Sequence, residues 1–336
     1  MEKLLKNELF RSFILSIVIF AVLMIGTATS VINSYWQGVL ILCGINIILA
    51  VSLNLAAGYL GQLTLGHAGF MSVGAYTSAL ISIYLNLPFI VSLLIGAIAA
   101  GIIGLIIGIP VLRLKGDYLC IITLAFNEII RVIMNNLEIT NGAKGLIGIP
   151  MNTNLVYVFI AMIITIFVVY SIVKSRHGRA IISIREDETA SELSGIDVGY
   201  YKVFAFAVSA IFAGLAGGLY AHYYTVILPK GFDFNKSVEI LVMVVLGGMG
   251  NLKGSIIAAI VLTIIPELLI SFSQYRMLLY AIVLIAAMIL KGTGKGEQIM
   301  ERLPFFKKKD EVKQNEYTII KSRRSWYSVW WIKGRR

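Results

Sequence analysis

Ten apolar runs, most of them near 20 residues long, follow one another along this chain of 336 residues. At about 1.5 Å per residue, a helix of that length crosses a hydrocarbon layer of about 30 Å. The composition agrees, because 58% of the residues are hydrophobic and only 14% are charged. The runs lack the period-2 alternation of a transmembrane β-barrel. They are residues 13–31, 38–57, 68–85, 89–112, 118–134, 155–173, 203–228, 237–250, 254–271 and 276–290.

The sequence therefore predicts an all-α integral membrane protein, a polytopic helical bundle of about eight to ten transmembrane helices. The count is a range because the fifth and eighth runs are short or interrupted. We expect the membrane domain to occupy residues 1–290. Residues 291–336 carry 13 Lys or Arg against 5 Asp or Glu. This basic stretch is expected to be a cytoplasmic tail that contacts anionic membrane lipid, and it does not indicate nucleic-acid binding.

The positions of the loop cations predict an orientation, because cytoplasmic loops carry an excess of Lys and Arg. With ten spans and the N-terminus inside, the inner side receives Lys3, Lys6, Arg11, Arg113, Lys115, Lys174, Arg176, Arg179, Arg185, Lys202 and Lys253. The outer side receives only Lys144, Lys230, Lys236 and Arg276. We therefore expect a multi-pass protein with both termini in the cytoplasm.

One stretch, GRAIISIREDETASELSG at 178–195, is too polar to cross a membrane. Seven charged residues lie between Arg176 and Glu192, and their insertion into lipid would cost on the order of 20 kcal/mol. The pattern is still helical, because proline is absent and Ile181, Ile184 and Leu193 recur near helical spacing. We expect a cytoplasmic amphipathic helix about 25 Å long. It is either a surface for a partner or a solvated helix without one.

A second irregular stretch is GYLGQLTLGHAGF at 58–70, where two spans meet. Its glycines predict either a broken helix, which transporters often place beside the substrate path, or tight packing of small residues. His67 is interpreted as a hydrogen-bonded packing residue, because the other histidines lie far away in sequence and no Cys or acidic cluster with metal-ligand spacing accompanies it. The glycines are Gly58, Gly61, Gly66 and Gly69.

The fifth apolar run contains a polar strip formed by Thr123, Asn127, Glu128 and Arg131. Ionisable groups inside a membrane usually mark a path or an ion pair. Glu128 and Arg131 are three positions apart and are expected to neutralise each other near the outer end of the helix. Thr123 and Asn127 are one helical turn apart and are interpreted as candidates to line a passage.

The sequence contains no motif for ATP hydrolysis. GTGKGE at 292–297 ends in Lys-Gly, and GGMGNLKG at 247–254 has neither the spacing nor the hydroxyl residue of a phosphate-binding loop. Close backbone packing or a turn at membrane level explains the second stretch better. Cys43 and Cys120 form no motif, and no metal motif or catalytic acid pair is found. The sequence predicts a protein that is not an enzyme and binds no metal.

Five stretches together form a specific pattern over most of residues 40–290. They are LNLAAGYLGQLTLGHAGFMSVGAY (53–76), RLKGDYLCIITLAFNEIIR (113–131), NGAKGLIGIP (141–150), SRHGRAIISIREDETASELSGIDVGYYKVFAFAVSAIFAGLAGGLYAHY (175–223) and VMVVLGGMGNLKGSIIAA (242–259). In this order they resemble the permease subunits of branched-chain amino acid ABC importers.

The resemblance implies a fold, a location and a set of partners. It implies an ABC type II-like permease in the bacterial cytoplasmic membrane, paired with a second homologous permease. An external substrate-binding protein would deliver the amino acid, and two ABC ATPase subunits would hold ATP and Mg, so that this chain has no cofactor of its own. An amino-acid zwitterion needs few charged groups along such a route, and the mostly uncharged spans agree.

The polar stretch at 178–195 corresponds to the coupling helix of that family, which docks on the ATPase. Ile181 and Ile184 are expected to be its buried anchors, and Arg185, Glu186, Asp187 and Glu188 its polar contacts. The family pattern of Glu-Ala-Ala followed by Gly is only partly kept. This chain has Thr189, Ala190, Ser191 and Gly195 at that spacing, so the glutamate is missing.

Two alternatives stay open at this point. Related permeases carry urea or short amides, and the sequence leaves the choice between these solutes and leucine, isoleucine or valine open. An ion-coupled secondary transporter would use His67 or Glu128 as its ion-linked residue. The charged helix favours the ATP-driven importer, because a secondary transporter has no ATPase to contact.

Overall fold

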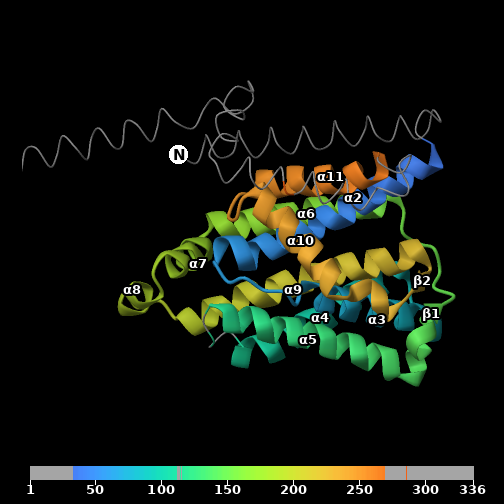
Figure 1. Ribbon diagram of the computed structural model, residues 1–336, viewed down its shortest axis with the longest axis horizontal. Helices are drawn as coiled ribbons and strands as arrows, with labels where there is room; N and C mark the ends of the chain where they lie inside the picture. Colours follow the sequence, from blue (N-terminus) through green and yellow to red (C-terminus); the bar gives the residue numbers. More distant parts are fainter. Residues whose placement is uncertain (1–32, 112–113, 115, 269–284, 286–336) are drawn as a thin grey trace, which may run out of the picture. The chain divides into compact units, whose positions relative to one another are not determined.

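The structure, a computed structural model, describes residues 33–111, 114, 116–268 and 285. These residues are almost entirely helical, which confirms the all-α prediction (Figure 1). The longer helices are α2 (Ser34–Leu53), α3 (His67–Tyr84), α4 (Phe89–Val111), α5 (Asp117–Asn136), α6 (Leu155–Lys174), α9 (Val198–Tyr224), α10 (Phe234–Gly247) and α11 (Leu252–Leu268). The short elements are the π-helix η1 (Asn54–Tyr59), α7 (Arg176–Glu186), α8 (Glu188–Leu193), and the 3-10 turns η2 (Glu138–Thr140), η3 (Gly142–Lys144) and η4 (Pro229–Phe232).

Five of the described helices are long and apolar enough to cross a membrane. They cover Ser34–Tyr59, Phe89–Val111, Tyr118–Asn136, Leu155–Lys174 and Val198–Tyr224. The predicted spans 13–31 and 276–290, apart from residue 285, lie outside the described residues, as do the end of 254–271 and the predicted tail 291–336. The total number of spans and the boundary at residue 290 therefore stay predictions.

The tightest packing lies where α3 and α4 cross α9. A Cβ atom added to Gly74 of α3 would lie 2.2 Å from the carbonyl oxygen of Gly214 on α9. One added to Gly217 of α9 would lie 1.9 Å from the carbonyl oxygen of Met71, and one added to Gly214 would lie 2.4 Å from the Cβ of Ala100 on α4. Helices in lipid associate through such small residues, because van der Waals contact replaces the hydrophobic effect there.

Helix α2 is buried along most of its length and is held by polar bonds to two other helices. Asn46 donates from Nδ2 to Thr263 Oγ1 on α11 at 2.9 Å, and Ser209 of α9 donates to the carbonyl oxygen of Ser52 at 2.7 Å. All four residues are buried or nearly so. Hydrogen bonds of this kind join transmembrane helices because an unpaired polar group in hydrocarbon is costly.

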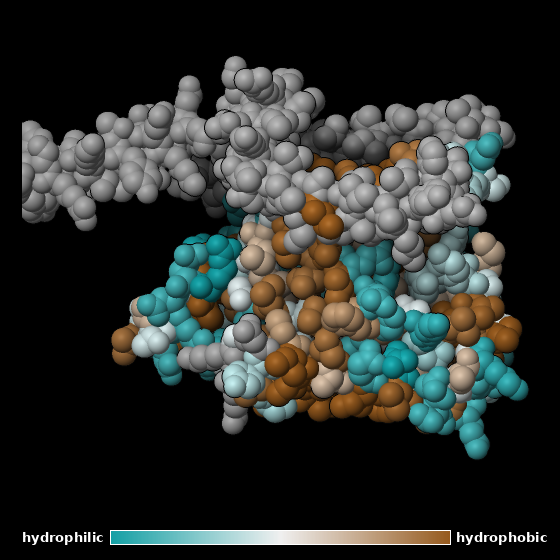
Figure 2. Space-filling view, in the orientation of Figure 1, coloured by the Kyte–Doolittle hydropathy of each residue, from teal (hydrophilic) through white to brown (hydrophobic). Residues whose placement is uncertain are grey.

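The helices run between two ends of this bundle. At one end lie α7 and α8 (the α7–α8 end), and at the other lies the short antiparallel pair of β1 (Leu146–Ile147) and β2 (Val226–Ile227) (the β1–β2 end), as Figure 1 shows. Hydrophilic residues cover α7 and α8, whereas hydrophobic residues cover the middle of the helices (Figure 2). The predicted inner cations that the structure describes belong to the α7–α8 end: Lys174, Arg176, Arg179, Arg185, Lys202 and Lys253.

Candidate coupling and translocation site

The polar stretch predicted as one rod forms two helices, α7 and α8, which meet at Asp187. The backbone of Asp187 is extended, with φ −156° and ψ 111°. Its side-chain Oδ1 accepts a hydrogen bond from the N–H of Ala190 at 3.0 Å and so caps α8. An aspartate in this position satisfies one of the unpaired N–H groups of a new helix. The continuous helix over 178–195 is therefore replaced by a bend at the residue that favours a cap.

Ile181 and Ile184 do not lie on the outer surface of this stretch. Ile181 is fully buried and Ile184 is 5% exposed, both on the side of α7 that faces the rest of the chain. They are buried, as expected, and they anchor α7 to the rest of this chain; a contact with an ATPase stays a prediction. The exposed residues of the stretch are Arg179, Arg185, Glu186, Asp187, Thr189, Ala190, Glu192, Leu193, Ser194 and Gly195.

Leu193 is the most exposed large hydrophobic residue that the structure describes, at 86%. It ends α8, and Gly195 follows with φ +83°. The N–H of Gly195 bonds the carbonyl of Glu192 at 2.9 Å, and the N–H of Ile196 bonds that of Ser191 at 3.1 Å. A glycine after a helix commonly takes this left-handed conformation and lets later N–H groups reach the last carbonyls. Gly195 therefore fixes how α8 ends.

Arg185 joins the two irregular stretches that the sequence singles out. Its Nη1 donates to the carbonyl oxygen of Gly58 at 3.0 Å. Its side chain also passes over Gly61, where an added Cβ would lie 2.7 Å from Arg185 Cγ, and over Gly250, where one would lie 2.8 Å from Nη1. The guanidinium group thus lies between α7, the η1 end of the first described span and the turn between α10 and α11.

The carbonyl group that Arg185 contacts belongs to a π-helix. In η1 the N–H of Leu60 bonds the carbonyl of Leu55 at 3.2 Å, five residues back. Such wide turns occur mostly as single turns at functional sites. The break predicted around Gly58 is present, because the chain is not helical between Leu60 and Gly66.

The turn GGMGN at 247–251 packs directly against this π-helix. The N–H of Gly250 donates to Asn54 Oδ1 at 2.9 Å, and Asn54 Nδ2 donates to Ser255 Oγ at 3.0 Å. A Cβ added to Gly58 would lie 2.4 Å from the nitrogen of Gly250. Gly248 and Gly250 both have positive φ, at +96° and +79°. The interpretation of this stretch as a tight turn in close backbone contact is therefore confirmed.

Helix α5 satisfies the non-helical backbone that follows the break. Thr123 Oγ1 accepts a hydrogen bond from the N–H of Leu65 at 3.0 Å, and the Cys120 thiol donates to the carbonyl of Leu63 at 3.0 Å. Irregular backbone at membrane depth is tolerated when other protein groups pair with it in this way. The break is thus closed on one side by α5.

Thr123 and Asn127 are fully buried in this structure, and their role as candidates to line a passage stays a prediction. A Cβ added to Gly66 would lie 2.8 Å from the Thr123 carbonyl oxygen, and one added to Gly69 would lie 3.2 Å from Asn127 Cα. The glycines allow α3 and α5 to approach closely, and the two polar residues form hydrogen bonds inside that contact. Asn127 donates from Nδ2 to the carbonyl of Phe232 at 3.4 Å.

His67 begins α3 and is 2% exposed. Its Nε2 lies 2.9 Å from Ser52 Oγ on α2. A buried histidine with a hydroxyl partner fits the packing interpretation made from the sequence.

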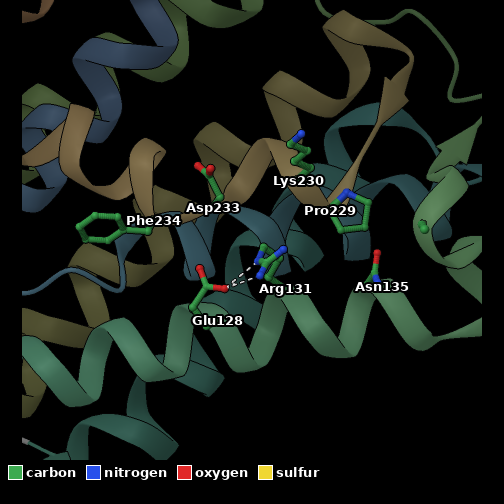
Figure 3. Close-up of a pocket in the computed structure, with 8 residues that line it drawn as sticks. Glu128, Arg131, Asn135, Pro229, Lys230, Asp233 and Phe234 are labelled. Carbon is green, nitrogen blue, oxygen red and sulfur yellow. Dashed lines mark hydrogen bonds and ion pairs between the residues drawn. The ribbon is translucent and has the colours of Figure 1, made fainter. Parts of the chain in front are cut away.

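Glu128 and Arg131 form the expected ion pair, and it borders a cavity. Arg131 Nη2 lies 2.6 Å from Glu128 Oε2, and Nε lies 2.7 Å from the same oxygen. Both side chains are about one third exposed, at 36% for Arg131 and 32% for Glu128. They face a cavity of about 430 Å³ between α5 and the segment that joins η4 to α10, as Figure 3 shows. Its lining is completed by Asn135, Ala143, Pro229, Lys230, Asp233 and Phe234.

The residues that line this cavity from η4 and α10 were missed in the sequence. Lys230 and Asp233 lie between the predicted spans 203–228 and 237–250, where charged loop residues do not by themselves indicate a binding site. The only local signals are Pro229, which begins η4, and Asp233, whose Oδ1 caps α10 by accepting from the N–H of Lys236 at 3.1 Å.

Glu188 is turned toward its own subunit. Its Oε1 lies 2.8 Å from Lys202 Nζ on α9, and the Lys202 side chain is only 5% exposed against 31% for Glu188. This pair fixes α8 to the beginning of the long helix α9. Glu188 therefore supports the bend between α7 and α8 and does not lie on the exposed face of α8.

The Glu188–Lys202 pair predicts an asymmetric effect on stability. Replacing Glu188 with Gln leaves the buried Lys202 ammonium uncompensated, which is expected to cost about 3 kcal/mol, whereas Lys202→Met removes the buried charge and is expected to cost less. The double variant should recover most of the loss. Thermal unfolding of the purified protein in detergent measures the order, and equal losses for both single variants would contradict it.

Comparison with known proteins gives this arrangement a family. Residues 35–290 match the family model described as branched-chain amino acid transport system / permease component. The chain is 36% identical over 285 residues to the high-affinity branched-chain amino acid transport system permease protein LivM of Escherichia coli, covering 74% of this chain and 67% of that protein. No solved structure gives a significant match.

Two more distant relatives extend the comparison. The probable branched-chain amino acid transport permease protein LivM of Methanocaldococcus jannaschii is 27% identical over 277 residues, covering 69% of this chain and 80% of that protein. The ribose import permease protein RbsC of Haemophilus influenzae is 27% identical over 265 residues, covering 72% and 77%. The family match spans most of the chain and includes every described helix, and this chain belongs to the branched-chain amino acid transport permease family.

Proposed function

We propose that this protein is the membrane-spanning permease subunit of an ATP-driven importer that moves leucine, isoleucine or valine into the cell. It would lie in the bacterial cytoplasmic membrane with both termini inside, paired with a second homologous permease. An external binding protein would deliver the amino acid. Two ABC ATPase subunits would bind ATP and Mg and perform the hydrolysis for which this sequence has no motif.

The contact between Arg185 and the carbonyl of Gly58 carries this proposal, because it links a polar surface helix to a break inside the bundle. α7 and α8 follow directly after one predicted span and precede another, so a push on them reaches α6 and α9. Their fixation by buried Ile181 and Ile184 and by the Glu188–Lys202 pair makes them rigid. A rigid element transmits the closure of an ATPase, whereas a flexible loop would absorb it.

The exposed side of α8 is the surface that would contact the ATPase. Leu193 at its end is an exposed apolar side chain that would enter a pocket on the ATPase. Glu186 and Glu192 on the same side would add polar contacts. Gly195 contributes through its backbone, because an added Cβ would meet nothing within 4 Å while its φ of +83° would strain other residues.

One observation weighs against an ion-coupled transporter that uses His67. Such a carrier needs an ionisable group that is free to bind its ion, whereas His67 is 2% exposed and lies at hydrogen-bond distance from Ser52. A permease for urea or short amides stays a second candidate. The similarity to a ribose import permease shows that related chains are named for different solutes.

Uptake measurements on the reconstituted complex test the proposal. Proteoliposomes that hold this chain with its partner permease and ATPases are expected to take up radiolabelled leucine when the binding protein is outside and ATP is on the nucleotide side. Ion gradients without ATP are expected to drive no uptake. Uptake driven by a proton or sodium gradient alone would contradict the ATP-driven mechanism, and competition by urea but not by valine would contradict the substrate class.

A further inference from the structure

We infer that the cavity between α5 and the η4–α10 segment is a binding subsite for the zwitterionic head of the amino acid on its route through this subunit. The inference rests on the proposed function and adds the residues that recognise the substrate. The cavity has a volume of about 430 Å³. That value lies within the range of about 300–1,000 Å³ typical of small-molecule sites.

The charges in the cavity are balanced and come from two separate elements. α5 contributes Glu128 and Arg131, while Lys230 belongs to η4 and Asp233 caps α10. Figure 3 shows Glu128 and Arg131 of α5 paired with each other on one side of the cavity and Asp233 and Lys230 on the other side. Two cations and two anions give no net charge. A free amino acid also has no net charge, but it carries a carboxylate and an ammonium group close together, so a balanced cavity suits both ends at once.

The carboxylate end is assigned to Lys230 and Arg131. Lys230 is exposed and forms no ion pair within the part of the chain that the structure describes. Arg131 uses Nε and Nη2 on a single oxygen of Glu128, which leaves further N–H groups of its planar fork for a second carboxylate. Cations from two elements thus border the same cavity.

The ammonium end is assigned to Glu128 and Asp233. Glu128 accepts both contacts from Arg131 on Oε2, so Oε1 keeps its acceptor capacity. Asp233 accepts the Lys236 N–H on Oδ1 at 3.1 Å and the Asn235 Nδ2 on Oδ2 at 2.8 Å, and each carboxylate oxygen has a second lone pair. These bonds hold Asp233 in place before a ligand arrives.

The rest of the lining suits an aliphatic side chain. Pro229, Phe234 and Ala143 add apolar surface beside the four charges. Neutral solutes such as urea or a sugar carry no charged group to match Lys230 and Asp233, and unmatched charges oppose binding. The cavity therefore favours an apolar amino acid over the neutral solutes carried by related permeases. On the face shown in Figure 2, hydrophilic residues gather over η4 and the start of α10 beside a hydrophobic surface.

The position of the cavity agrees with a route through the bundle. It lies toward the β1–β2 end, which the loop cations place outside, where the binding protein would dock. The carbonyl of Phe232, next to Asp233, accepts from Asn127 Nδ2, and Asn127 packs on Gly69 close to the beginning of α3. The residue next to Asp233 is thus linked through Asn127 to the beginning of α3, which follows the broken segment.

Charge-removal variants of the complete importer test the subsite. Uptake of leucine is measured in proteoliposomes at saturating, loaded binding protein. Lys230→Gln is expected to lower uptake about tenfold, the loss that follows removal of one charge-assisted hydrogen bond. Lys230→Arg should retain most of the uptake, because it keeps a cation at this position.

Lys144→Gln is the matched control, since Lys144 is an exposed cation at the same end that does not line the cavity. It is expected to keep uptake within about twofold, consistent with the small effect of a surface charge. Normal uptake by Lys230→Gln, or an equal loss with Lys144→Gln, would overturn the subsite while leaving the importer function intact. Absence of ATP-driven leucine uptake by the unmodified complex would instead overturn the proposed function.

Discussion

Replacing Arg185 with alanine is expected to lower ATP-driven leucine uptake by roughly ten- to a hundredfold, because one charge-assisted hydrogen bond is worth about 1.5 to 3 kcal/mol. The variant loses the bond from Nη1 to the Gly58 carbonyl and the packing of the side chain over Gly61 and Gly250. ATP hydrolysis should continue, since the exposed face of α8 stays intact. The signature is therefore hydrolysis without matching transport, measured as the number of ATP molecules consumed per leucine.

Arg179→Ala is the matched control for this variant. Arg179 lies on the same helix and is exposed, and the structure gives its side chain no hydrogen bond within the described residues. The Arg179→Ala variant removes an equal charge from α7 and leaves the contacts of η1 unchanged, so uptake should stay within about twofold of normal. Equal losses in the two variants would mean that the charge of α7 matters and the contact with Gly58 does not.

Gly217→Ala is expected to be the most destabilising single substitution at a glycine of α9. The added Cβ would lie 1.9 Å from the carbonyl oxygen of Met71 and 3.0 Å from the nitrogen of Ala75, so α3 and α9 would have to separate. Backbone cannot move aside as a flexible side chain can. Overpacking of this kind costs about 1 to 3 kcal/mol, and a backbone clash belongs at the upper end. A lower thermal midpoint and reduced yield of folded protein in detergent are expected.

Gly199→Ala in the same helix provides the comparison. Its Cβ would meet only Asp197 Oδ1, at 3.5 Å, which is an ordinary contact. Alanine has the higher helix propensity, by up to about 1 kcal/mol, so this variant should be as stable as the parent or slightly more so. If Gly217→Ala unfolded at the same temperature as Gly199→Ala, the close crossing of α3 and α9 would be wrong.

Much of the fold follows from the sequence, because apolar length is a local property. The predicted run 203–228 corresponds to α9 at Val198–Tyr224, and 155–173 to α6 at Leu155–Lys174. The bend at Asp187 was missed, although an Asp followed by Glu, Thr and Ala is a good helix start. The pattern of isoleucines across 178–195 suggested continuity and outweighed that local signal.

The candidate site depends on contacts between distant segments, and these are not visible in local patterns. The sequence marks Arg185 and Gly58 as unusual. However, 127 positions separate them, and nothing in either stretch predicts a contact with the other. The burial of Thr123 and Asn127 was likewise not visible in the local pattern, because polar residues on a membrane helix face either a passage or a close helix contact. The close contact in this structure is made by Gly66 and Gly69, which lie opposite them.

The π-helix at Asn54–Tyr59 has a mechanical consequence for α2. A π-turn holds one more residue than an α-turn, so rewinding it to α geometry would rotate α2 by about 100° relative to the segment beyond and shift it about 1.5 Å along its axis. The backbone N–H groups of η1 would stay hydrogen-bonded, because each would move from the carbonyl five residues back to the carbonyl four residues back. We expect the bond from Arg185 to the Gly58 carbonyl to oppose such a rotation, because it holds the π-helix in its present geometry.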